Sequence, residues 1–401
     1  MTEIEKKTTP GKTTADKTVV MQILPALQSG GVERGTIDIA KALKKSDFKP
    51  IVISNGGIMV YQLNEANITH IRLPTNKKNF FTILGNINKI AKLIREYQVD
   101  IVHVRSRAPM WSAYFACKKT NTKLVSTVHG TYSLNFFNWK IFPLKKLYNS
   151  IMFRANKVIV VSEFIKDYAL QNYGQNLQEN ITVIHRGVEL NYFNPEKVSK
   201  NRIINLSKKW NLPEDKKIIL MPARFTSWKG HEFLIEALMK LSNDFFCIMV
   251  GSDHGHKKFR RKIENRIVKE NLVGKVKIVG PCEDMPAAYT IAHIVISAST
   301  KPEAFGRISI EAQSAGKIVI ATNIGGSLET ITDGKTGFLV NVGNVDQLTQ
   351  LIDKALEMKK EETDVIGTAA RKNAEENFSN QRMCDETIKI YKSLLDHPQD
   401  L

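Results

Sequence analysis

The chain has 401 residues, of which 42% are apolar and 24% are charged, and its formal net charge is +18. One hydrophobic core rarely serves so many residues, so we expect roughly two to three domains of ~100–200 residues. The composition excludes a disordered or fibrous chain. No stretch approaches the ~18 consecutive apolar residues of a membrane-spanning helix, and the polar residues 1–17 lack the apolar centre of a signal peptide. We therefore expect a cytoplasmic protein with a disordered tail over residues 1–17.

The basic charge is concentrated in the first half of the chain. Residues 1–190 hold 27 Lys and Arg against 13 Asp and Glu, whereas residues 191–401 hold 31 against 27. Such a field attracts phosphate groups of nucleic acids, lipid headgroups or small anions. No nucleic-acid recognition module is present, so we expect no nucleic-acid partner. The four widely spaced cysteines, without a C-x-x-C pair, are typical of a reducing compartment and argue against structural zinc or disulfides.

Apolar runs and helical spacing alternate from Thr18 onward, which predicts parallel strands flanked by helices. We expect, in chain order, a strand at Thr18–Leu24, a glycine loop and a helix through Leu43, a strand at Pro50–Ser54, a helix at Ile83–Tyr97, and strands at Asp100–Val104, Lys123–Val128, Val158–Ser162 and Ile181–Ile184. An Asn-, Pro- and Lys-rich loop at Asn191–Asn201 then separates this series from a second one.

The second series repeats the architecture. We expect strands at Lys216–Met221, Phe245–Val250, Val276–Val279, Ile294–Ser297, Ile318–Ala321 and Gly337–Val340, and helices at Glu232–Leu241, Lys257–Glu270, Ser309–Ala315, Asp346–Leu356 and Glu361–Leu395. The fold class is therefore α/β, and ligands are expected at the carboxyl ends of the strands. The predicted domains are residues 18–190 and 191–377, followed by a final segment over 378–401.

Two glutamates, Glu303 and Glu311, stand on either side of a strand-to-helix turn and can face one ligand. The free backbone N–H groups near Gly306 and Arg307, at the start of the following helix, suit phosphate oxygens. A carboxylate on that helix can accept two hydrogen bonds from a ribose diol.

This E-x7-E pattern resembles the signature of the retaining glycosyltransferases of family 4. The resemblance extends to the glycine loop Gly30–Arg34, to Pro222–Gly230 with its Arg and Lys, and to Val183–Glu189. In the last segment, His185 and Arg186 replace a common Pro-Asn pair. The resemblance implies a GT-B fold: two facing Rossmann-like domains with a central cleft, an acceptor bound by the first and a nucleotide sugar by the second, and a C-terminal helix that crosses back to the N-terminal domain.

The resemblance also implies roles for single residues. Catalysis would fall to Glu303, Arg224, Lys229 and His129, and donor binding to Gly30, Gly31, Phe305, Gly306, Arg307, Glu311 and Cys282. Arg224 and Lys229 would neutralise the charge that builds on the departing diphosphate, so neither a metal nor a cofactor is expected. The alternatives are an exposed surface pair for Arg224 and Lys229, a solvated helix face for Glu311, and a loop carboxylate stabilised by the helix dipole for Glu303.

The acceptor is less well defined by the sequence. Arg105 and Arg107 follow a predicted strand, and they could bind an anionic or lipid-linked acceptor together with Arg186. Residues 139–157 mix basic and large apolar side chains, which fits either contact with an anionic membrane surface, on the inner face of the cell membrane, or ordinary core packing. We expect synthesis of a bacterial envelope glycan of the lipopolysaccharide type. The alternatives are a soluble transferase acting on a small metabolite or polysaccharide, and a non-catalytic sugar-nucleotide-binding protein.

Overall fold

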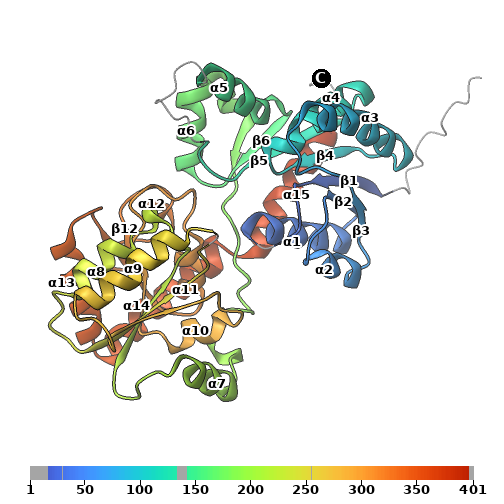
Figure 1. Cartoon of the computed structure of the whole chain (residues 1–401). Coiled ribbons are helices and arrows are strands. Elements are labelled where there is room, and N and C mark those ends of the chain that lie inside the picture. The colour runs from blue at the N-terminus through green and yellow to red at the C-terminus, as the bar shows by residue number, and fades with distance from the viewer. Residues whose placement is uncertain (1–16, 29, 133–141, 254, 397–401) are drawn as a thin grey trace, which may run out of the picture. The chain divides into compact units, whose positions relative to one another are not determined.

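A computed structural model describes residues 17–28, 30–132, 142–253 and 255–396. These residues form two parallel β-sheets with helices packed around them (Figure 1). Each predicted strand has a counterpart in the structure, but the strand Thr69–Arg72 and several helices, among them Arg107–Thr120, Glu163–Tyr173 and Met285–Ile291, were not predicted.

The first sheet has seven strands in the order β3-β2-β1-β4-β5-β6-β7. Its strands are β1 (Thr18–Ile23), β2 (Phe48–Ser54), β3 (Thr69–Arg72), β4 (Ile101–Val104), β5 (Lys123–Val128), β6 (Lys157–Val160) and β7 (Ile181–Val183). The helices of this series are α1 (Gly31–Lys45), α2 (Val60–Glu65), α3 (Phe80–Glu96), α4 (Arg107–Thr120), α5 (Phe142–Ser150) and α6 (Glu163–Tyr173), with short 3-10 helices η1 (Ile151–Arg154) and η2 (Gln175–Asn180).

The second sheet has six strands in the order β10-β9-β8-β11-β12-β13. Its strands are β8 (Lys217–Pro222), β9 (Phe245–Val250), β10 (Val276–Val279), β11 (Ile294–Ser297), β12 (Ile318–Thr322) and β13 (Phe338–Val340). Counted from β8, this is the 3-2-1-4-5-6 order of a Rossmann sheet, whose direction of winding reverses between β8 and β11. Ligands bind such sheets at the carboxyl ends of the strands beside this reversal.

The helices of the second series complete the chain. They are α7 (Lys200–Trp210), α8 (His231–Leu238), α9 (Lys257–Lys269), α10 (Met285–Ile291), α11 (Arg307–Ser314), α12 (Ser327–Thr330), α13 (Val345–Glu357), α14 (Lys360–Asn377) and α15 (Asn380–Asp396), with 3-10 helices η3 (Pro195–Lys197) and η4 (Ser227–Lys229). Apolar side chains from one face of the sheet, at alternate positions such as Ile219 and Met221, pack with side chains of α8, α9 and α13 in a continuous core.

The predicted helical stretch Glu361–Leu395 consists of two helices, α14 and α15, with a break at Phe378 and Ser379, and the last helix lies within the final segment that the sequence predicts from residue 378. The Phe378 carbonyl accepts a hydrogen bond from the Val188 N–H (2.8 Å), and Val188 in turn accepts one from the Asn380 N–H (3.0 Å). The Ser379 hydroxyl then accepts from the Arg382 N–H at the start of α15. Backbone pairing with a distant segment therefore ends one helix, and a serine begins the next.

Close contacts divide the described residues into two compact units, at positions other than the predicted boundary at residue 191. Of the described residues, the first unit holds those up to Thr127, residues 142–158, and α15 from Ile388 onward. The second unit holds residues 128–132 and Ile159–Thr387. The end of the last helix is thus packed in the first unit, where the Tyr391 hydroxyl lies 2.5 Å from His103 Nδ1.

Candidate active site

Lys229 and Glu303, which the sequence places 74 residues apart, form an ion pair in the second unit. Lys229 ends η4, just after β8, and its Nζ lies 2.7 Å from Glu303 Oε1. The Ser299 hydroxyl donates to the same oxygen. Only 8% of the lysine side chain and 14% of the glutamate side chain are exposed. A largely buried pair with a third partner has a fixed geometry, which is what a site for a charged ligand requires.

Glycines allow the loops of the site to approach each other closely. Gly230 has a positive φ of 79°, and a Cβ atom there would lie 1.8 Å from the Ala298 carbonyl oxygen. Gly325 has φ 58°, and its Cβ would lie 2.5 Å from the Glu303 carbonyl oxygen, which also accepts a hydrogen bond from the Gly326 N–H. Only glycine fits at these positions, so the loops after β8, β11 and β12 hold one another in place.

Helix α11 begins at the same edge of the sheet. Gly306 forms its N-cap with φ 85°, and Arg307 and Glu311 form an ion pair of 2.7 Å within it. The Ser309 hydroxyl in the first turn is buried and has no hydrogen-bond partner among the described residues. A buried hydroxyl without a partner is uncommon, and here it lies beside backbone N–H groups that a helix leaves unpaired. Sequence reasoning missed Ser309, whose residue type alone gives no signal.

Glu311 is held through both of its carboxylate oxygens. Arg307 donates to Oε1, and the Tyr289 hydroxyl donates to Oε2 at 3.0 Å. Burial, with a further contribution from the Glu311 charge, raises the pKa of Tyr289 well above its ordinary value. The phenol therefore keeps its proton and stays a donor. Tyr289 was not predicted, because it comes from a helix 22 residues earlier in the chain.

Two further predicted residues lie at the ends of neighbouring strands. Arg224 is exposed in the loop after β8. Cys282 is partly buried in the loop after β10, and burial raises the pKa of its thiol.

His129 and Arg186 lie together in the second unit. Arg186 Nη1 is 3.0 Å from His129 Nδ1. A Cβ placed on the neighbouring Gly130 would lie 3.8 Å from the Ala304 Cβ, so this segment lies against the loop that carries Glu303. The structure thus places the segment of His129 beside the Glu303 loop and pairs Arg186 with His129; the predicted roles of both residues stay predictions.

Phe305, between Glu303 and Gly306, is fixed by aromatic contacts. It stacks on His185 with ring centroids 5.6 Å apart and meets Phe378 edge-on. The preceding residue is also fixed, because the Ser162 hydroxyl donates to the Ala304 carbonyl. The loop after β11, which carries Glu303 and Phe305, is therefore held by His185 and Ser162, which precede β8 in the chain, and by Phe378, which follows it.

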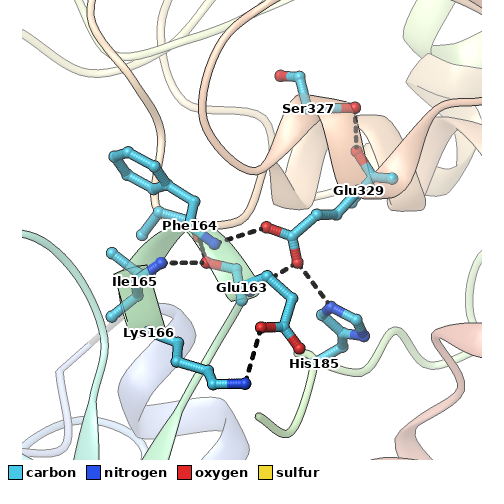
Figure 2. A network of polar contacts seen from close by, with 10 residues as sticks. Glu163, Phe164, Ile165, Lys166, His185, Ser327 and Glu329 are labelled. Atoms are coloured by element: carbon cyan, nitrogen blue, oxygen red, sulfur yellow. Dashed lines mark hydrogen bonds and ion pairs between the residues drawn. The ribbon is translucent and has the colours of Figure 1, made fainter. Parts of the chain in front are cut away.

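Glu329, in α12, is the centre of a network of polar contacts with the start of α6 and with His185 (Figure 2). Its carboxylate accepts hydrogen bonds from the backbone N–H groups of Glu163 and Phe164, at the start of α6, and lies 2.9 Å from His185 Nε2. Burial raises the pKa of Glu329, but the bonds from His185 and from the two backbone N–H groups outweigh it and leave the pKa lowered. Glu329 was missed in the sequence; the only signal was the unusual His185 beside Arg186.

The remaining predicted residues belong to the first unit. Gly30 is the N-cap of α1 with φ 150°, and Gly31 is the first residue of that helix. Arg105 is buried, and its Nε donates to Gln22 Oε1 at 3.0 Å. Arg107 Nη1 donates to Asn149 Oδ1 at 2.7 Å. Both arginines thus have partners within their own unit, and acceptor binding by them stays a prediction.

In the described ranges, no group of three or more His, Cys, Asp or Glu side chains could hold a metal ion. No helix in the same ranges is long and apolar enough to cross a membrane.

Comparisons with known proteins identify the family of the chain. The family profile "Glycosyltransferase Family 4" matches residues 29–192, and "Glycosyl transferases group 1" matches residues 203–373. The crystal structure of a glycosyltransferase from Rickettsia africae ESF-5 is 44% identical, covers 95% of this chain and 99% of its own, and superposes with a TM-score of 0.86. The chain belongs to the family 4 glycosyltransferases.

Two more distant relatives of this glycosyltransferase extend the comparison. Anabaena Alr3699/HepE in complex with UDP-glucose is 23% identical, with 94% of this chain and 100% of that chain covered and a TM-score of 0.80, which confirms the GT-B fold. The capsular polysaccharide biosynthesis glycosyltransferase CapM of Staphylococcus aureus is 24% identical over 94% of this chain and 97% of its own.

Proposed function

We propose that this glycosyltransferase moves a sugar from a nucleotide-diphosphate sugar to an acceptor hydroxyl, with retention of the anomeric configuration and without a metal ion. The observation that carries the proposal is the Lys229–Glu303 pair beside the start of α11, at the reversal between β8 and β11. The UDP-glucose bound by Anabaena HepE, a protein of the same fold, supports a donor of this class.

The charges of the site match the reaction. Cleavage of a glycosyl–phosphate bond builds negative charge on the leaving diphosphate, which fixed donors stabilise. Lys229 has three N–H donors, of which one is used by Glu303. The others, together with Arg224 and the first N–H groups of α11, would bind the phosphate oxygens. Arg224 can bind two oxygens at once, whereas Lys229 acts as a point charge.

The two glutamates take different parts of the donor in this proposal. Glu303 Oε1 accepts hydrogen bonds from Lys229 and Ser299. We propose that Glu303 Oε2 accepts hydrogen bonds from hydroxyls of the sugar. Glu311, held by Arg307 and Tyr289, would bind the ribose. Substitution on the same face of the sugar, guided by the leaving phosphate, accounts for retention without a covalent intermediate.

The test compares Lys229→Met with Lys240→Met. Lys240 is an exposed lysine of the same unit that pairs with Asp346. Loss of Lys229 should lower kcat at least ~100-fold, as removal of one oxyanion donor does, while the Lys240 variant should keep the wild-type rate. Equal rates in the two variants would contradict the proposed site.

Two further measurements address the mechanism. Proton NMR of the product should show the anomeric configuration of the donor sugar, and inversion would contradict retention. A chelator should leave the rate unchanged; a rate that needs added Mg²⁺ would overturn the metal-free proposal.

We further propose that the acceptor is a glycan of the bacterial envelope, presented at the inner membrane. The named role of CapM in capsular polysaccharide synthesis supports this class of acceptor. Helix α5 exposes Leu144 and Leu147 next to Lys145 and Lys146. This pattern suits contact with an anionic lipid surface. Residues 139–141 of the predicted membrane segment lie outside the described residues.

A further inference from the structure

Arg186 is fixed in place by the backbone that follows it. Val188 exchanges hydrogen bonds with Phe378 and Asn380, at 2.8 and 3.0 Å. A Cβ on Gly187 would lie 2.6 Å from the Asn380 Cα, so the two segments are in close backbone contact. The Arg186 side chain is itself buried, with 9% exposed. Its guanidinium therefore has little freedom to leave His129.

The contact between Arg186 and His129 determines which ring nitrogen carries the proton. A guanidinium has only N–H donors and no acceptor, so His129 Nδ1, 3.0 Å from Arg186 Nη1, must accept. A neutral imidazole that accepts at Nδ1 carries its proton at Nε2. A protonated ring would place an N–H of His129 against an N–H of Arg186. The contact thus disfavours both the imidazolium and the other tautomer.

We propose that Arg186 is a positioning residue that keeps His129 as the neutral Nε2–H tautomer, so that the ring donates a hydrogen bond to a hydroxyl of the donor sugar. This inference rests on the proposed function, in which His129 contacts the donor. It makes His129 a hydrogen-bond donor in the transition state and removes it as a general base. The neighbouring Gly130 lies against Ala304, next to Glu303, and the proposal takes the ring to face the sugar that Glu303 binds.

This proposal gives a physical reason for Arg186 at the position where Asn is common in the family. An Asn amide carries both a donor and an acceptor, so it fits either tautomer of a neighbouring histidine. Arg fits only one. The pair His185-Arg186 therefore supplies two separate contacts, His185 to Glu329 and Phe305, and Arg186 to His129.

The first test is spectroscopic and does not depend on activity. In the full-length protein labelled with ¹⁵N-histidine, long-range ¹H–¹⁵N spectra near neutral pH distinguish the two tautomers and the imidazolium. The His129 signals are those lost in His129→Gln. We expect the Nε2–H tautomer in the wild type and in Arg186→Lys, whose ammonium can also only donate, and a mixture of forms in Arg186→Met. The signals of His185 should not change and serve as the internal control.

A wild-type His129 found as the Nδ1–H tautomer or as the imidazolium overturns the inference. So does an Arg186→Met spectrum that leaves the His129 signals in place in a protein with a cooperative melting transition. Since these readouts need no donor, they stand even if the proposed function fails.

The second test is kinetic and uses the nucleotide sugar that the wild type turns over. Arg186→Met should lower kcat at least ~10-fold, which corresponds to about 1.4 kcal/mol of transition-state free energy, with a smaller change in KM for the donor. Arg186→Lys should restore most of the rate. A changed tautomer with an unchanged kcat would refute the catalytic part alone, and a wild type that turns over no nucleotide sugar would refute the proposed function.

Discussion

At the scale of single residues, two carboxylates of the site accept hydrogen bonds from different donors at specific oxygens. Glu303 receives two donors on one oxygen, whereas Glu311 receives one donor on each. Charge-assisted hydrogen bonds of this kind are short and directional. Each carboxylate is therefore oriented by the protein, and a ligand that binds it gains from geometry already in place.

Replacing Tyr289 by Phe tests this orientation. The change removes the donor to Glu311 Oε2 and leaves the buried ring in place. If Glu311 binds the ribose, the KM for the donor should rise ~10-fold, about the free energy of one hydrogen bond to a charged group, while kcat changes little. Steady-state kinetics of Tyr289→Phe and of the exposed-residue control Tyr61→Phe measure this. A donor KM equal to that of the control would contradict the proposal that Glu311 binds the donor.

At the scale of elements, Glu329 connects α12 with the start of α6 and with His185. A carboxylate at a helix N-terminus satisfies backbone donors and interacts favourably with the helix dipole. Because His185 also stacks on Phe305, the same contacts hold the loop after β11 that carries Glu303.

The lowered pKa of Glu329 gives this contact a pH dependence. A carboxyl whose pKa is lower in the folded state contributes stability that is present above its unfolded value of ~4.3 and is lost as the pH falls through the folded value. Glu329→Gln should therefore lower the Tm at neutral pH, and the difference from the wild type should shrink below about pH 4. Thermal melts across this range measure the effect. A gap that stays constant with pH would mean that the charge of Glu329 does not matter.

The positions of most strands could be predicted, because parallel strands are buried and leave apolar runs in the sequence. Their order in each sheet was not predicted, since it depends on contacts that apolar runs do not specify. The strands at Phe245–Val250 and Val276–Val279 have the predicted bounds. Helix α7 was not predicted, since its start lies in the polar stretch taken as a loop and its apolar residues are few. Helices whose stability comes from one narrow packed stripe give a weak signal in a single sequence.

The candidate site could be predicted only in part. Glu303 and Lys229 were found through motifs that resemble a known family, and the structure joins them. Glu329 and Tyr289 lie in no such motif, and their partners are distant in the sequence or come from backbone N–H groups, which carry no residue identity. The pairing of Arg186 with His129 depends on a tertiary contact across 57 residues.

At the scale of the whole molecule, the charge asymmetry supports the proposed membrane contact. Exposed Leu144 and Leu147 lie in the strongly basic first half, and electrostatic attraction to anionic lipid is screened by salt. The protein should sediment with phosphatidylglycerol vesicles at low salt, much less at high salt, and little with phosphatidylcholine vesicles.

The double change Leu144→Gln and Leu147→Gln should weaken this binding several-fold, because each removes apolar area from the interface. Val268→Gln, at an apolar residue of the second unit that is equally exposed, is the matched control. Binding that is independent of salt, or equal loss in the control, would argue against a role for α5.

The second unit begins earlier in the chain than its strands suggest. Ile159–Thr387 includes Ser162, which donates to Ala304, and the start of α6, which binds Glu329. A gene fragment cut at residue 203, where the second family profile begins, would discard these supports and leave the Glu329 carboxylate facing solvent. A chimera that exchanges the second unit between related enzymes should therefore carry residues 159–202 along with the rest of that unit.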